Sequence, residues 1–148
     1  LMARLGLSKS LEDLYPHSLS SGMKRQVEII RALINDPKVL LLDEPFRALD
    51  SMTKSLMHEY LLEVFEITKK TIFFITHDLE EAVFLADRIF VMTTRPGTFK
   101  AVIDVDIPRP RDFRVLASER FMELKEQAAA AVREETLKAF EAGERELA

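Results

Sequence analysis

The sequence contains no cysteine and no tryptophan, and only four of its 148 residues are glycine. Without cysteine, disulfide scaffolds, thiolate zinc sites and cysteine nucleophiles are excluded. No apolar run approaches the roughly 18–20 residues that a membrane-spanning helix needs. A net charge of −4 argues against a protein that coats nucleic acid. What is present is the composition of a packed domain, because 47% of the residues are apolar and 31% are charged.

Apolar residues alternate between strand-like and helix-like spacing along the chain. Helices are predicted over about 23–34, 51–68, 78–86 and 113–140, and strands over 39–42, 71–75, 88–92 and 101–107. Val39–Leu42 and Thr71–Ile75 are continuous apolar runs, which predicts fully buried strands, whereas Asp104 and Asp106 interrupt the last strand as at an exposed edge. Such strands separated by helices predict an α/β fold whose parallel sheet is covered on both faces.

Three of the predicted helices carry apolar stripes, and that of the first helix is Met23, Val27, Ile30 and Ile34. The stripe of the second long helix is Met52, Leu56, Tyr60 and Val64, and that of the last helix is Phe121, Leu124, Ala128 and Ala131. We expect the last stripe to pack on its own domain or on a second copy. The proline-rich joint Pro108–Pro110 indicates a boundary, so we predict one domain over 1–112 and a helical appendage over 113–148, with a frayed tail from Glu141.

Three polar residues lie where two predicted strands end. Asp43 and Glu44 follow the first strand and His77 follows the second, and ligands of open parallel sheets bind at these carboxyl ends. There a carboxylate can hold a divalent cation through water or polarise an attacking water. Taken alone, the two acids are better explained as caps of the following loop and His77 as a core histidine. His17 and His58 have no metal-ligand spacing to His77, so we expect no metal cluster.

The order of four short segments resembles the nucleotide-binding subunits of ABC transporters. The segments are Leu19–Met23 (signature motif), Val39–Pro45 (Walker B), Ala48–Asp50 (D-loop) and Thr76–Asp78 (switch histidine). Within this family, three further features are similar to importers for nitrate, sulfonate and taurine: Met23, Thr94–Gly97 and Ile107–Asp112. The resemblance implies a P-loop NTPase-like parallel sheet flanked by helices, here incomplete and running from the signature helix through the carboxyl-terminal part.

The resemblance assigns Ser20, Ser21 and Gly22 to the γ-phosphate of an ATP held by the opposite subunit. A hydroxyl and free backbone N–H groups at a helix start also favour an anion on physical grounds. Ser21 departs from the family pattern, which has glycine at this position. Its side chain could crowd the phosphate or stiffen the backbone.

The remaining roles implied by the resemblance concern hydrolysis. Asp43 holds Mg²⁺ through water, Glu44 orients or deprotonates the attacking water, His77 contacts the γ-phosphate, and Asp50 links the two sites across a dimer. The implied cofactors are ATP and Mg²⁺. The implied partners are a second nucleotide-binding subunit, forming a homodimer, transmembrane permease subunits and, indirectly, a solute-binding protein, with no nucleic acid. The implied location is the cytoplasmic face of the cell membrane, peripherally through the permease.

A Walker A loop needs two glycines five apart followed by Lys and Ser or Thr. The glycines are Gly6, Gly22, Gly97 and Gly143, and none of them fits this pattern. We therefore expect the chain to be the carboxyl-terminal portion of an ATPase subunit and to be inactive alone. Two alternatives stay open: a soluble ATPase of the same superfamily that acts on nucleic acid or ribosomes, and a non-catalytic regulatory module that keeps the motifs as structure.

Overall fold

The computed structural model describes residues 14–146, with side chains described through residue 140. By its internal contacts the chain divides into two compact units, Leu1–His77 and Asp78–Ala148. Within the described residues, no helix combines the length and apolarity of a membrane span.

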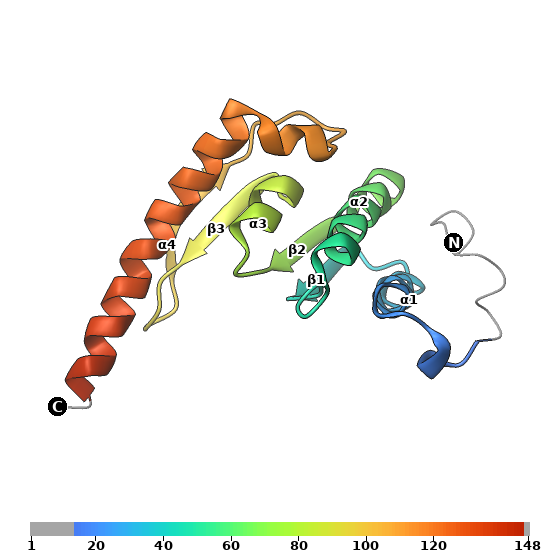
Figure 1. Cartoon of the computed structure of the whole chain (residues 1–148), viewed down its shortest axis with the longest axis horizontal. Coiled ribbons are helices and arrows are strands. Elements are labelled where there is room, and N and C mark those ends of the chain that lie inside the picture. Colours follow the sequence, from blue (N-terminus) through green and yellow to red (C-terminus); the bar gives the residue numbers. More distant parts are fainter. Residues whose placement is uncertain (1–13, 147–148) are drawn as a thin grey trace. The chain divides into compact units, whose positions relative to one another are not determined.

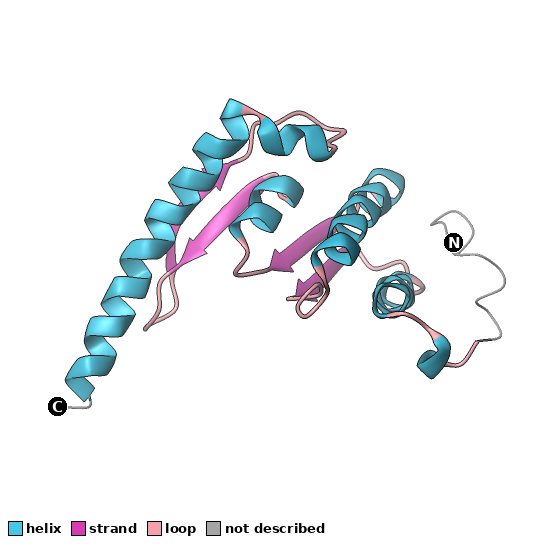
Figure 2. Cartoon of the chain, viewed as in Figure 1, coloured by secondary structure: helices cyan, strands magenta, loops and turns pink. Residues whose placement is uncertain are grey.

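The first unit contains two helices and a pair of strands (Figures 1 and 2). Its elements are the 3₁₀ turn η3 (Pro16–Ser18), α1 (Ser21–Leu33), β1 (Val39–Asp43), α2 (Ser51–Thr68) and β2 (Thr71–Ile75). The predicted segments 23–34, 39–42, 51–68 and 71–75 are therefore confirmed as elements. Asp50 caps the start of α2 by accepting a hydrogen bond from the Thr53 N–H, 2.9 Å. Lys69 ends α2 in the left-handed region, with φ 50°.

Strands β1 and β2 are parallel, and Asp43 lies opposite Ile75 in their register. Leu40 and Leu42 are buried, whereas Leu41 is 74% exposed and Phe73 is 55% exposed. The expectation of fully buried strands is thus wrong for this pair, because successive side chains point to opposite faces and residues 14–146 cover only one of them. The parallel pairing itself is confirmed.

The buried face of α2 differs from the predicted stripe. Tyr60 and Val64 are buried as expected, but Met52 and Leu56 are 71% and 59% exposed. The core is instead reached by Met57 and Leu61, which share a helix face with Tyr60 and Val64 at spacings of three and four. A strict four-residue repeat drifts around a helix of 3.6 residues per turn, which explains why the first half of that stripe was wrong.

The second unit joins a short helix, a hairpin and a long helix. Its elements are α3 (Leu79–Leu85), β3 (Arg88–Met92), β4 (Phe99–Asp104), the 3₁₀ turn η4 (Phe113–Ala117) and α4 (Glu119–Glu146). Strands β3 and β4 form an antiparallel pair, so the expected sheet is parallel only between β1 and β2. The connection around Arg95–Gly97 is too short for a parallel crossover and dictates this hairpin. Alternation continues past β4, where Val105 and Ile107 are buried.

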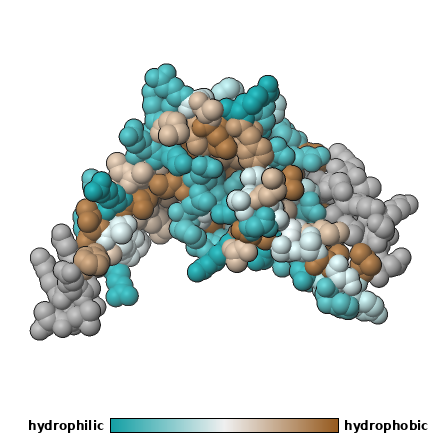
Figure 3. Space-filling view, viewed as in Figure 1, coloured by the Kyte–Doolittle hydropathy of each residue, from teal (hydrophilic) through white to brown (hydrophobic). Residues whose placement is uncertain are grey.

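The long helix α4 packs along β3, β4 and α3 of its own unit. Phe121, Leu124 and Ala128 are at most 1% exposed, which confirms that this stripe packs on the chain itself, and Ala131 is half-buried. Apolar residues also reach the surface along α4 (Figure 3), among them Met122, Val132, Leu137 and Phe140. The helix begins six residues later than predicted and runs beyond Phe140 to Glu146. The predicted domain boundary at Asp112 does not coincide with the division at His77, since α4 shares a core with residues before it.

Two arginines bind the carboxyl end of α3. The Arg109 Nη2 donates to the Leu85 carbonyl oxygen, 2.6 Å, and its Nε donates to Asp87 Oδ1, 2.9 Å. The side chain of Arg111 is 1% exposed. Its guanidinium donates to backbone carbonyl oxygens on both sides of it, those of Phe84, Ala86, Val105 and Ile107. Burial lowers the pKa of Arg111 to about 10, so the guanidinium stays charged at neutral pH and satisfies carbonyls that a helix end leaves unpaired.

A buried carboxylate ties α4 to the hairpin. Glu135 is 5% exposed and accepts hydrogen bonds from Lys138 Nζ, 2.9 Å, and from the Thr94 N–H, 3.4 Å. Lys100 Nζ lies 3.1 Å from Glu135 Oε1 and also donates to the Ala131 carbonyl oxygen, 3.0 Å. The hydrogen bonds from Lys138 and Lys100 lower the pKa of Glu135 to about 2.

This lowered pKa predicts an acid-sensitive contribution to stability. Because the folded-state pKa lies below the ordinary value of 4.5, the contribution is complete above about pH 4.5 and is lost as the pH falls toward 2. We expect Glu135→Gln to flatten the loss of stability across that range. Urea unfolding, followed by circular dichroism from pH 6 to pH 2, measures the difference. Glu126→Gln, an exposed position of α4, is the matched control. Parallel curves for wild type and Glu135→Gln would contradict the assignment.

Candidate nucleotide-hydrolysis site

Glu44 follows β1 directly and has an unusual backbone. Its φ is 41°, in the left-handed region that side chains seldom adopt. Its N–H donates to the Ile75 carbonyl oxygen at the end of β2, 2.9 Å. The chain thus turns sharply at the end of the sheet, and the hydrogen bond across the strand pair fixes where the Glu44 side chain begins. Strained conformations of this kind cluster at functional sites.

The carboxylate of Glu44 meets the ring of His77, as the parallel strand ends predict. Glu44 Oε1 lies 2.9 Å from His77 Nδ1. An ionised carboxylate only accepts, so the Nδ1 carries the proton in this contact. The His77 side chain is 75% exposed, which leaves its Nε2 side open to a ligand and excludes the alternative of a core histidine. Glu44 Oε2 is buried and makes no hydrogen bond among the described residues.

The loop after Glu44 is held in place by a buried phenylalanine. Phe46 is 1% exposed and contacts the rings of His58 and Phe74, with centroids 5.4 and 5.5 Å apart. The Arg47 N–H donates to the Glu44 carbonyl oxygen, 3.1 Å, and this hydrogen bond closes a turn that contains Phe46. The buried aromatic ring therefore keeps the Glu44 turn in place.

Asp43 is exposed at the last position of β1. A single carboxylate suits Mg²⁺, which keeps several waters and takes one or two protein carboxylates with substrate phosphates. The described residues contain no group of three His, Cys, Asp or Glu side chains able to enclose a metal. The exposed Asp43 carboxylate therefore fits a water-bridged Mg²⁺ that a nucleotide brings with it.

The signature residues form the start of α1. Ser20 is the N-cap, and its Oγ accepts from the Met23 N–H, 3.2 Å. Ser21 is the first helical residue and is exposed. The hydroxyls of Ser20 and Ser21 thus lie at the positive end of a 13-residue helix, where an anion is stabilised.

Gly22 touches the next helix, a contact that the sequence did not reveal. A Cβ atom at Gly22 would lie 2.9 Å from Cγ2 of Thr53. Thr53 is also the residue whose N–H is accepted by Asp50, and hydrogen bonds from Thr53 lower the pKa of Asp50. Thr53 therefore connects the signature glycine with the D-loop aspartate, and the glycine is required because the two helices approach closely.

The contact predicts a suppressor. Gly22→Ala should lower the free energy of unfolding by about 1–3 kcal/mol through overpacking. In the double variant Gly22→Ala/Thr53→Ser the obstructing methyl is gone, and most of the loss should be recovered. Thr53→Ser keeps the backbone N–H that Asp50 accepts. Urea unfolding of the four proteins measures the coupling. Equal losses with threonine and with serine at position 53 would contradict the steric assignment.

The structure brings together some of the predicted site residues. Asp43, Glu44 and His77 lie at one end of the strand pair. Gly22 and Asp50 both lie against Thr53, Gly22 beside its methyl group and Asp50 through a hydrogen bond from its N–H. The hydrogen bonds and ion pairs of the described part do not join Ser20 or Gly22 to Glu44 or His77. Thr53 and Arg47 were missed by sequence reasoning, because their contacts arise from helix packing and from the loop turn.

Comparison with known proteins finds similar sequences of one kind. The model described as "ABC transporter" matches residues 1–47. An ABC transporter ATP-binding protein of Methanocaldococcus jannaschii is 42% identical over 89% of this chain and 48% of its own length. The aliphatic sulfonates import ATP-binding protein SsuB of Bacillus cereus is 46% identical over 78% of this chain and 45% of its own length. The nitrate import ATP-binding protein NrtD of Synechocystis is 40% identical over 84% and 49%.

A solved structure agrees with these relatives. A dimeric ATP-binding cassette in a post-hydrolysis state, bound to ADP and Pi, matches 76% of this chain and 45% of its own chain, with 29% identity and a TM-score of 0.53. The fold is therefore of the P-loop NTPase class, as expected. The chain is similar to ABC transporter ATP-binding proteins, among them those of the nitrate and sulfonate importer type. It spans about half the length of the curated relatives that it matches.

Proposed function

We propose that this chain forms part of an ATP-binding and ATP-hydrolysing subunit that energises an importer for a small anionic solute such as nitrate, sulfonate or taurine. The observation that carries the proposal is the contact of Glu44 Oε1 with His77 Nδ1 at the end of the parallel strands, 2.9 Å. The names of the sulfonate and nitrate relatives support the solute class.

Each side chain has a chemical task in this proposal. Glu44 orients the attacking water and accepts its proton, because a carboxylate within hydrogen-bond reach of a water can act as a general base. His77 binds the γ-phosphate through Nε2. With Nδ1 engaged by Glu44, the ring donates to a phosphate oxygen through Nε2 only when both nitrogens carry protons. Asp43 holds Mg²⁺ through water, and Mg²⁺ neutralises phosphate charge when bound.

The phosphate-binding residues act across a dimer. Ser20, Ser21 and Gly22 contact the γ-phosphate of the nucleotide on a second subunit, and Asp50 links the two sites. The lack of hydrogen bonds between this segment and Glu44 or His77 within the described chain supports an action in trans. Permease subunits are the membrane partners, a solute-binding protein acts indirectly, and nucleic acid is no partner. The subunit is then peripheral on the cytoplasmic face of the membrane.

The proposal is tested in a chimeric subunit, in which this chain replaces the matching part of the Bacillus cereus sulfonate relative. The chimera should hydrolyse MgATP. The chain alone should show no MgATP affinity by calorimetry, since no Walker A loop is present in its sequence to wrap the α- and β-phosphates. Light scattering should show self-association of the chain alone, because Leu41, Phe73 and Ile75 are exposed. A folded chimera without ATPase activity, or micromolar MgATP binding by the chain alone, would contradict the proposal.

A further inference from the structure

Arg47 lies beside the carboxylate that the proposed mechanism uses. Its Nη1 is 3.3 Å from Glu44 Oε2. The same two residues are joined by the backbone hydrogen bond from the Arg47 N–H to the Glu44 carbonyl oxygen, 3.1 Å. A turn closed in this way sets residues i and i+3 side by side, so the pair follows from the backbone. Phe46 lies between the two residues in the sequence, and its buried side chain holds the turn in place.

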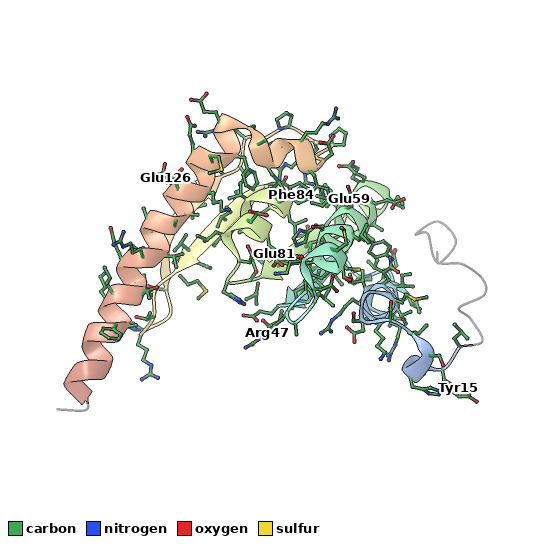
Figure 4. The ribbon with its side chains drawn as sticks, in the orientation of Figure 1. Tyr15, Arg47, Glu59, Glu81, Phe84 and Glu126 are labelled. Carbon is green, nitrogen blue, oxygen red and sulfur yellow. The ribbon has the colours of Figure 1, made fainter. Side chains whose placement is uncertain are left out.

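The two oxygens of the Glu44 carboxylate therefore have different neighbours. Oε1 faces the His77 ring, and Oε2 faces Arg47. The Glu44 side chain is 28% exposed and the Arg47 side chain is 74% exposed. Arg47 thus reaches the carboxylate from the solvent side of the loop; Figure 4 labels its position just before α2. Because Oε2 is buried and accepts no hydrogen bond in the described residues, the guanidinium charge acts on it through space.

We propose that Arg47 is a positioning residue for hydrolysis. Its guanidinium attracts Oε2, which keeps the carboxylate plane in the orientation that holds Oε1 on His77. This inference rests on the proposed function, since it assigns Arg47 a task only if Glu44 is the base. Arg47 contacts neither water nor nucleotide in this scheme and acts through Glu44. An ordinary exposed ion pair would instead contribute slightly to folding and leave turnover unchanged.

The kinetic test uses the chimeric subunit. Arg47→Ala should lower kcat about tenfold, with the KM for ATP within about twofold, because a rotated base loses transition-state stabilisation rather than substrate binding. Arg47→Lys should restore most of kcat, since it keeps the charge. In the Glu44→Gln background, Arg47→Ala should cause no further loss. Arg114→Ala is the matched control, an exposed arginine paired with Asp112 in the second unit. A loss equal to that of Arg114→Ala, or an additive loss in the Glu44→Gln background, would overturn the proposal.

A second measurement separates this inference from the proposed function. In the chimeric subunit, whether or not it hydrolyses ATP, the ¹⁵N signal of His77 Nδ1 reports its hydrogen bond to Glu44. Arg47→Ala should move this signal toward that of the Glu44→Ala variant, which cannot make the hydrogen bond, whereas Arg114→Ala should leave it in place. If the unmodified chimera fails to hydrolyse ATP, the proposed function is wrong. The change in the His77 signal then still shows whether Arg47 positions the Glu44 carboxylate. An unchanged His77 signal in Arg47→Ala would refute the role of Arg47.

Discussion

Glu44→Gln is expected to reduce kcat for ATP hydrolysis by roughly 100-fold or more in the chimeric subunit while ATP binding stays nearly intact. The amide keeps the shape of the carboxylate but cannot accept the proton of the attacking water. It can still hydrogen-bond to the His77 ring from the same turn, so the backbone geometry at φ 41° is not disturbed. Steady-state hydrolysis and nucleotide binding by calorimetry, made on the same preparation, separate the two effects.

The control for Glu44→Gln is Glu59→Gln, an exposed position of α2 (labelled in Figure 4) that leaves the sheet end unchanged. This variant should hydrolyse ATP at the unmodified rate. Turnover of Glu44→Gln close to that of Glu59→Gln would remove Glu44 from the mechanism and favour the regulatory alternative, in which the motifs serve only as structure.

Phe121→Ala is expected to lower the free energy of unfolding by about 3–5 kcal/mol. Phe121 is 1% exposed, in the stripe with Leu124 and Ala128 that packs on the hairpin and α3, so truncation leaves a cavity. The next residue is a matched control: Met122 is 54% exposed, and Met122→Ala should change stability by no more than about 0.5 kcal/mol. Urea unfolding of both variants measures the contrast.

The same pair of variants tests the sequence-based expectation that residues after Asp112 form a semi-independent appendage. A dispensable helix would tolerate Phe121→Ala as well as it tolerates Met122→Ala. The burial of Phe121 favours the opposite result, in which removal of residues 113–148 exposes the core of the second unit and destabilises it. Similar stabilities for the two variants would support the expectation that residues 113–148 form a semi-independent appendage.

Local signals made several elements predictable. Asp50 and Asp78 accept hydrogen bonds from the first turns of α2 and α3, as aspartates before apolar helices commonly do. The strand ends at Asp43 and Ile75 follow from continuous apolar runs, and their parallel pairing brings Glu44 to His77. A further local signal was overlooked at Ser118, whose Oγ accepts a hydrogen bond from the Phe121 N–H. This serine immediately precedes α4, which begins at Glu119, six residues after the predicted start.

Other features depend on packing and could not be predicted from the sequence. A continuous apolar run does not say which face is covered, so the exposure of Leu41 and Phe73 was missed. The approach of Gly22 to Thr53 requires knowledge of how α1 and α2 meet. The ion pair of Glu44 with Arg47 depends on a positive φ, which residue type alone does not predict for glutamate.

The arginine at position 111 has a consequence for experiments that follow folding through backbone amides. Its guanidinium donates hydrogen bonds to carbonyl oxygens, from Phe84 and Ala86 on one side and from Val105 and Ile107 on the other. No amide hydrogen takes part in these bonds, so amide hydrogen exchange does not register them directly. In that region the amide of Val105, which donates to the Asp87 carbonyl oxygen, is the reporter instead. Its protection should collapse in Arg111→Met, even though no bond of its own has been removed.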